Sequence, residues 1–153
     1  MLETPHVIVG AAIATKVGNP ALAIPLALAS HFVLDKVPHW NPHLNSETVK
    51  FGNPTKGSTY FVIADVSLSI ISGVFIASRV LPDLGHFITI LAASFASVLP
   101  DVVEGPYFFL NMRSALVKRW ISFQRSLQVD ASIIPGLLTQ LATIIAAFWW
   151  ILG

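Results

Sequence analysis

Long apolar segments separated by short polar breaks run through most of the chain. Gly18-Asn19-Pro20 ends the first of them, and a proline-containing turn at 81–85 separates the third from the fourth. A helix rises ~1.5 Å per residue, so the longer segments can cross most or all of a ~30 Å hydrocarbon core. The pattern predicts helices at about 7–17, 20–37, 60–80, 86–99 and 132–152.

Two stretches between these segments differ in pattern. Residues 38–57 are polar and contain three prolines and two glycines, which predicts a surface loop. From about 107 to 128, apolar residues recur every three or four positions with basic residues between them. This spacing predicts one amphipathic helix lying at a membrane interface. Its apolar positions are Met112, Leu116, Trp120, Phe123 and Leu127.

The amino-acid composition indicates that these predicted helices belong to an integral membrane protein. Hydrophobic residues make up 54% of the 153 and charged ones only 11%, whereas a soluble domain has roughly a quarter charged residues. We therefore expect one all-α domain, 1–153: a polytopic membrane bundle of about five membrane-embedded helices, in two hairpins plus a last span, with one amphipathic interfacial helix. A net charge of +1 gives no reason to expect a nucleic-acid partner, and a homo-oligomer stays open.

The hairpins place the N-terminus, 38–57 and 100–130 on one face, and the acidic start of the chain predicts that the first apolar segment is retained. The opposite face holds only Lys16 and Arg79. By the positive-inside rule, the first face is the cytoplasmic side of the cell (inner) membrane. Its basic residues are Lys36, Lys50, Lys56, Arg113, Lys118, Arg119 and Arg125.

Ionisable residues of the kinds that bind metals gather at this same level. His31 and Asp35 are one helical turn apart, and His39 follows the proline that should stop their helix. Such groups are costly in a membrane unless they have a partner, a metal or water, so they indicate a functional site. With no cysteine, a metal must be held by histidine and carboxylate. The candidate ligands are His6, His31, Asp35, His39, Asp65, Asp101 and Glu104.

A short internal similarity supports the hairpins. Residues 10–17 match 73–80 in the positions of a glycine, an isoleucine-alanine pair and a basic residue before valine. Each copy leads through a turn to a helix ending in Val-Leu and an acid. A chance match is one explanation. The other is a duplication relating 5–39 to 68–105, with the site between the halves.

Three of these motifs together resemble a family. Pro5-His6 with Gly10, the Ser-His-x-x-x-Asp-x-x-Pro-His segment 30–39, and Leu-Pro-Asp-x-x-Glu at 99–104 are similar to small bacterial and archaeal membrane proteins classed as metal-dependent hydrolases. The His-x-x-x-Asp spacing is similar to that of zinc-dependent phospholipase C. The resemblance covers roughly the first 110 residues and implies hydrolysis of phosphate esters. A second His-x-x-x-Glu pair is missing, which leaves the substrate and the number of metals open.

A site of this kind would hydrolyse phosphate esters with the help of two metal ions. Two divalent ions, Zn²⁺ first and Mn²⁺ or Fe²⁺ otherwise, would activate water and stabilise displacement at phosphorus. Asp35 is the expected bridge, Asp65 completes a shell or orients a ligand, and Glu104 is a ligand or the general base. A lipid or lipid-linked phosphate would enter from the bilayer, with its head group paired to Lys36, Arg113, Lys118 or Arg119.

Simpler interpretations compete with each assignment. His31 and Asp35 can be a packing pair, His6 can lie at the interface, and Asp101 and Glu104 can punctuate a helix end. His43 reads as a solvated loop residue, and Asp83 with His86 as a solvated turn on the far face. Two other functions stay open: a path for protons or divalent cations, and a non-catalytic assembly protein. A path would need ionisable groups at graded depths, whereas these cluster at one level.

Overall fold

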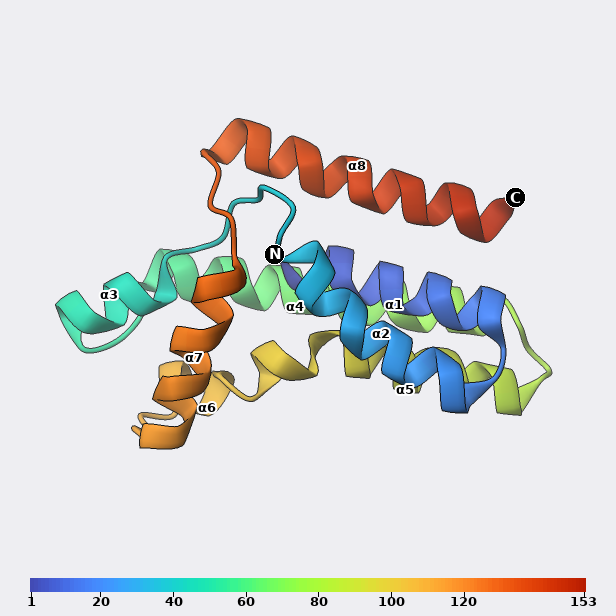
Figure 1. Cartoon of the computed structure of the whole chain (residues 1–153), viewed down its shortest axis with the longest axis horizontal. Helices are drawn as coiled ribbons and strands as arrows, with labels where there is room; N and C mark the ends of the chain where they lie inside the picture. Colours follow the sequence, from blue (N-terminus) through green and yellow to red (C-terminus); the bar gives the residue numbers. More distant parts are fainter.

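The computed structural model describes all 153 residues as an all-helical chain without strands, which confirms the all-α part of the predicted fold class (Figure 1). Eight helices follow one another: α1 (Glu3–Val17), α2 (Pro20–Leu34), α3 (Leu44–Phe51), α4 (Lys56–Ser78), α5 (Leu84–Val102), α6 (Gly105–Phe109), α7 (Ala115–Leu127) and α8 (Ile133–Leu152).

The centre of the bundle is α1, which α2, α4, α5 and α8 all contact. Small side chains let these helices approach closely. At Gly10, a Cβ atom would lie 2.7 Å from Ser97 Oγ and 2.9 Å from the carbonyl oxygen of Ala93, so only hydrogen fits between α1 and α5 there. This close packing brings the first turn of α1 beside the last turns of α5, where the candidate ligands lie.

The two expected hairpins are present. The turns between α1 and α2 and between α4 and α5 lie together at one end of the molecule, while α3, α6 and α7 lie toward the other (Figure 1). The matching segments 10–17 and 73–80 run up to these two turns from the last turns of α1 and α4. The hairpins therefore put the beginning of α1 and the ends of α2 and α5 on the same side of the molecule, away from the turns. Whether they arose by duplication stays a prediction.

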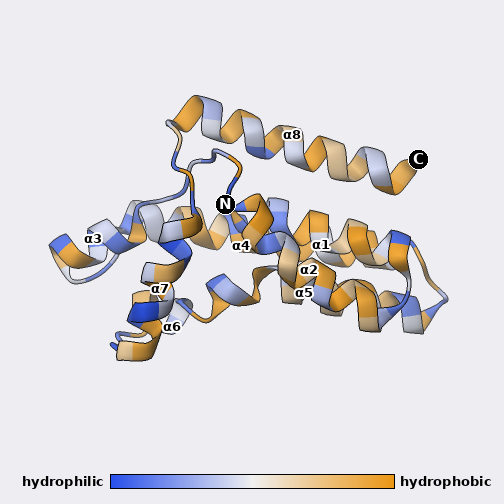
Figure 2. Ribbon diagram, viewed as in Figure 1, coloured by the Kyte–Doolittle hydropathy of each residue, from blue (hydrophilic) through white to orange (hydrophobic).

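Three helices, α4, α5 and α8, are long and apolar enough to cross a membrane. Orange stretches of their ribbons in Figure 2 mark hydrophobic residues, and large apolar side chains such as Leu68, Ile71 and Ile134 are exposed. This supports a membrane protein. The expected five membrane-embedded helices are matched by three spans only. α1 and α2 have 15 residues each, and at ~1.5 Å per residue they fall short of a ~30 Å core.

Two sequence-based predictions about the polar stretches are wrong. The expected amphipathic helix 107–128 is broken into α6 and α7 by residues 110–114. Asn111 adopts a positive φ of 55°, and Arg113 donates to the Tyr107 carbonyl at 2.6 Å and to the Gly52 carbonyl, which fixes the break. The expected loop 38–57 contains α3, which ends where Gly52 takes a φ of 85°.

Helix ends also differ from the predicted ones. α2 stops at Leu34 rather than near 37, with Asp35 as its C-cap. α5 runs through Pro100 to Val102 and therefore includes Asp101, which the pattern placed after the helix. Only the last turn of α5 is affected by the missing N–H of Pro100, so the helix continues.

Glu47 of α3 fastens the beginning of α4. Its carboxylate accepts hydrogen bonds from Thr55 N and Ser58 Oγ, both at 2.7 Å. Partial burial raises the pKa of Glu47, but these hydrogen bonds outweigh it and hold the pKa below its ordinary value of 4.5. The junction should thus be fully stabilised above about pH 4.5 and loosen as the pH falls through the lower folded pKa. Hydrogen exchange measures this: the protection factor of the Thr55 amide should be high at pH 7 and fall as Glu47 becomes protonated.

In the Glu47→Gln variant the protection factor of the same amide should be lower at pH 7. It should no longer change with pH in that window, because glutamine does not titrate. An amide equally protected in both proteins down to pH 3 would contradict the assignment.

Candidate metal centre

Four ionisable side chains meet at the ligand end of the hairpins, and all are almost fully buried. The exposed fraction is 0% for His6, His31 and His39 and 1% for Asp35. His6 lies in the first turn of α1, His31 in the last turn of α2, and Asp35 caps that helix. The helix spacing of i and i+4 puts His31 and Asp35 on one face, and the tight contact of α1 with α2 adds His6.

The carboxylate of Asp35 is the point on which the histidines converge. His6 Nε2 lies 3.4 Å from Asp35 Oδ1, and His39 Nε2 lies 4.0 Å from the same oxygen. His31 Nε2 lies 3.4 Å from the other oxygen, Oδ2. Two ligands on one tetrahedral Zn²⁺, with bonds of about 2.0–2.1 Å, are separated by about 3.3–3.4 Å. The amino group of Met1 also pairs with Oδ1, so a cationic group already lies against this carboxylate.

The surroundings of His31 call for a cation. Its Nδ1 donates to the Ser97 carbonyl at 2.8 Å, which in a neutral ring leaves a lone pair on Nε2. That nitrogen faces only oxygen atoms that accept hydrogen bonds. A second ring proton or a metal ion is needed to make such an arrangement favourable. The facing atoms are Gln124 Oε1 at 3.0 Å, Asp35 Oδ2 at 3.4 Å and Asp101 Oδ1 at 3.8 Å.

His6 and His39 carry ring nitrogens without any hydrogen-bond partner. In His39, Nδ1 donates to the Val37 carbonyl at 2.7 Å, and Nε2 has no partner. In His6, both ring nitrogens are buried and unpartnered. Buried polar atoms are almost always satisfied, so these need an explanation. A backbone carbonyl that fixes one nitrogen and leaves the other free is the usual arrangement behind a metal-binding histidine, and the site fits a metal on this ground.

Asp101 and Glu104 continue the site on the α5 side. His6, His31 and Asp101 each offer one ligand atom within 4.8 Å of the others. Gln124 of α7 links the two acids, because its Nε2 donates to Asp101 Oδ1 at 3.2 Å and to Glu104 Oε1 at 2.5 Å. Burial raises the pKa of Glu104 to about 7; the negative charge of Asp101 adds to this, and the hydrogen bond from Gln124 opposes it.

Asp65 has a different place from the ligands around Asp35. Its carboxylate accepts from the backbone N–H of Glu3 at 2.6 Å and of Thr4 at 3.3 Å, and from Thr4 Oγ1 at 2.7 Å. A carboxylate at the beginning of a helix satisfies free N–H groups and interacts favourably with the helix dipole. Asp65 therefore holds the first turn of α1, which carries His6, and its carboxylate hydrogen-bonds to that turn and not to the histidines.

Sequence reasoning missed two residues of the site. Glu3 has a buried Oε2 without a partner, and Gln124 is 2% exposed among the acids described above. A signal existed for each. Gln124 is a polar residue at helical spacing from the apolar Trp120 and Ile121, and Glu3 is an acid three positions before His6.

A cavity of about 1030 Å³ opens beside Asp101, at the end of α5, and Glu104, at the junction of α5 and α6. Its lining includes Glu3, Asp101, Glu104 and Gln124, and Arg125 is its one lysine or arginine. The four cations expected to bind a head group lie elsewhere. Lys36, Lys118 and Arg119 are exposed and outside the lining, and Arg113 is bound to the backbone around the α6–α7 break.

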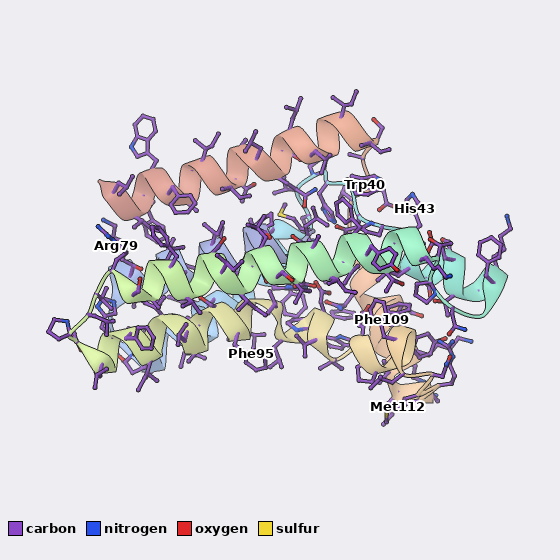
Figure 3. All side chains as sticks on the ribbon, turned by 180° about the vertical axis from the view of Figure 1, so that it is seen from behind. Trp40, His43, Arg79, Phe95, Phe109 and Met112 are labelled. Carbon is purple, nitrogen blue, oxygen red and sulfur yellow. The ribbon has the colours of Figure 1, made fainter.

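The remaining polar residues are outside the centre. His43 is exposed at the beginning of α3 and lines the outer part of the cavity (Figure 3). Asp83 caps α5 through the His86 N–H at 3.0 Å, and His86 Nε2 contacts the Ala14 carbonyl at 3.1 Å, so this far turn is structural. No family model, no curated protein and no solved structure matches the chain. Function is therefore inferred from the side chains themselves.

Proposed function

We propose that the chain is a membrane-embedded, metal-dependent hydrolase of phosphate esters or diphosphates, acting on a lipid or lipid-linked substrate. One observation carries this proposal. Three buried imidazole Nε2 atoms, from His6, His31 and His39, face a single carboxylate, and none of them has a neutral donor to pair with. Buried groups of this kind, close together beside a cavity, are the usual composition of a metal-assisted hydrolytic site.

The division of the histidines between the two oxygens of Asp35 favours two ions. Oδ1 faces His6 and His39, and Oδ2 faces His31, beyond which lies Asp101. Two divalent cations would offset most of the negative charge of four carboxylates in this region, where the Met1 amino group is the cation beside Asp35. Mixed histidine and carboxylate ligands suit Zn²⁺ first, with Mn²⁺ or Fe²⁺ as alternatives. The carboxylates are Glu3, Asp35, Asp101 and Glu104.

Bound divalent ions would supply Lewis-acid activation of water and of a phosphoryl oxygen. The chain's own groups do the rest. Glu104 accepts the proton of the attacking water, and Gln124 holds its carboxylate in place through the 2.5 Å hydrogen bond. Arg125 pairs with the phosphate at the cavity. By the positive-inside rule, the basic residues around this end support a site that faces the cytoplasm.

Metal quantification combined with substrate screening tests the proposal. Purified protein should carry about two divalent ions per chain by elemental analysis, as a dinuclear site requires. It should release phosphate or a phosphorylated head group from one class of lipid phosphates, and a chelator should abolish this. Protein with no bound metal would refute the proposal. Metal-loaded protein without hydrolytic activity on monoesters, diesters and diphosphates would favour the cation-binding function instead.

Arg125 and Arg119 give a matched pair for the head-group contact. Both lie on α7, both are exposed, and only Arg125 lines the cavity. We expect Arg125→Gln to raise KM for the lipid phosphate about tenfold, since a charge-assisted hydrogen bond is lost, while Arg119→Gln changes it less than about twofold. Steady-state kinetics in mixed micelles measure both. Equal effects would show that the cation acts through the general surface potential.

A further inference from the structure

The cavity beside the acids continues as an apolar cleft between α4 and α5. Val7 of α1 lies at its base. Three serines, Ser67, Ser69 and Ser94, line the cleft. The walls are otherwise aliphatic and aromatic side chains from two helices that are both long enough to span a membrane. They are Val66, Ile70 and Val74 of α4 and Leu91, Phe95 and Val98 of α5. Figure 3 shows this side of the molecule, with Phe95 on α5 and Phe109 on α6.

This cleft is open to the side. Ile70 is 60% exposed and Phe95 is 56% exposed, although both line the cavity. In a bilayer, side chains at such positions on spanning helices meet lipid chains and not water. The base is fixed by close packing, because a Cβ atom at Gly73 would lie 3.1 Å from Val7 Cγ1. The cleft therefore has a firm base, apolar walls and a mouth toward the hydrocarbon region.

The polar end has the opposite character. Glu3, Asp101 and Glu104 line it together with Arg125, and the histidines around Asp35 lie behind Asp101. One continuous cavity thus joins a mostly apolar half to an acidic end that lies beside the proposed metal site. A water-soluble phosphate ester would use only one of these halves.

We propose that the α4–α5 cleft holds the hydrocarbon chain of an amphiphile with one phosphate head group. This molecule enters from the bilayer and places its phosphate at the Arg125 end of the cavity. The head-group chemistry rests on the proposed function, while the chain site rests on the cleft alone. Because the chain leaves bilayer hydrocarbon and not water, its affinity comes from close van der Waals packing against α4 and α5.

Ile70 and Ile71 provide the test. They are neighbours on α4 with similar exposure, 60% and 65%, and only Ile70 lines the cavity. Equilibrium binding of radiolabelled hexadecyl phosphonate, which cannot be hydrolysed, is measured on the full-length protein in nanodiscs. Ile70→Trp should raise Kd about tenfold, because the bulkier ring fills part of the cleft and forces the chain out of its close packing. Ile71→Trp should change Kd less than about twofold.

Methyl phosphonate has the same head group without the chain. It should bind far more weakly than hexadecyl phosphonate and be indifferent to both tryptophan variants. Equal Kd values for the two phosphonates, or equal effects of the two variants, would overturn the chain site. If Ile70→Trp instead changed the oligomeric state and left Kd unaltered, the occupant would be a second copy of the chain. If hexadecyl phosphonate bound in this way but the metal-loaded protein hydrolysed no lipid phosphate monoester, diester or diphosphate, the cleft would stand and the proposed function would be refuted.

Discussion

Replacing Asp35 with asparagine should abolish metal binding and activity while leaving the fold intact. Asparagine has nearly the same shape, but it carries no charge and offers one oxygen where Asp35 presents Oδ1 to His6 and Oδ2 to His31. We expect the bound metal to fall from about two ions to less than one. We expect kcat/KM to fall at least about a thousandfold, since Lewis-acid stabilisation supplies several kcal/mol. Elemental analysis and steady-state kinetics measure both.

The control is Asp83→Asn at the far turn. Asp83 caps α5 through the His86 N–H, and asparagine caps a helix about as well as aspartate. This variant should keep its metal and its activity. Retention of two ions by Asp35→Asn would show that Asp35 holds no metal and that its contacts with the histidines serve packing alone.

Adding one methyl group at Gly136 should lower both the stability of the fold and the affinity for metal. A Cβ atom there would lie 2.4 Å from Trp40 N and 2.9 Å from the carbonyl carbon of His39, so the backbone of the 39–40 segment must move. Overpacking of this kind costs about 1–3 kcal/mol. Because His39 is part of the displaced segment, metal affinity should also fall roughly 10- to 100-fold. Thermal unfolding and metal titration of Gly136→Ala test the two effects separately.

Gly57→Ala serves as its control, because a Cβ atom there meets nothing nearer than Thr55 Oγ1 at 4.0 Å. This variant should be as stable as the parent or slightly more so, since alanine favours a helix over glycine. Loss of stability in Gly136→Ala with unchanged metal affinity would remove His39 from the ligand set.

The contact at Gly136 also shows why α8 belongs to the site. Gln140 accepts from the Leu2 N–H at 2.8 Å and donates to the Trp40 carbonyl at 3.0 Å. The last helix thereby fastens both the beginning of α1 and the segment after His39. From the sequence, α8 was a final span and nothing more, because a glycine and a glutamine in an apolar helix do not say what they touch.

Much of the fold could be predicted from the chain. Apolar runs and their breaks located five of the helices and the two hairpins, because periodic hydrophobicity and prolines act locally. The break at 110–114 was missed, since the helical spacing from Met112 to Leu127 continues across it. Only the contacts of Arg113 with the Gly52 and Tyr107 carbonyls define that break, and Gly52 is sixty-one residues away in sequence.

The candidate ligands also divide into features that local patterns predict and features that only the packing of distant helices decides. The sequence by itself determined that His6, His31, Asp35, His39 and Asp101 belong to one level, because helix ends and hairpin topology follow from local patterns. Tertiary structure alone decided their roles. It turned Asp65 toward the beginning of α1, brought Glu3 and Gln124 beside the acids, and left Arg125 as the cation of the cavity. These outcomes depend on side-chain directions between helices far apart in sequence, which no local periodicity encodes.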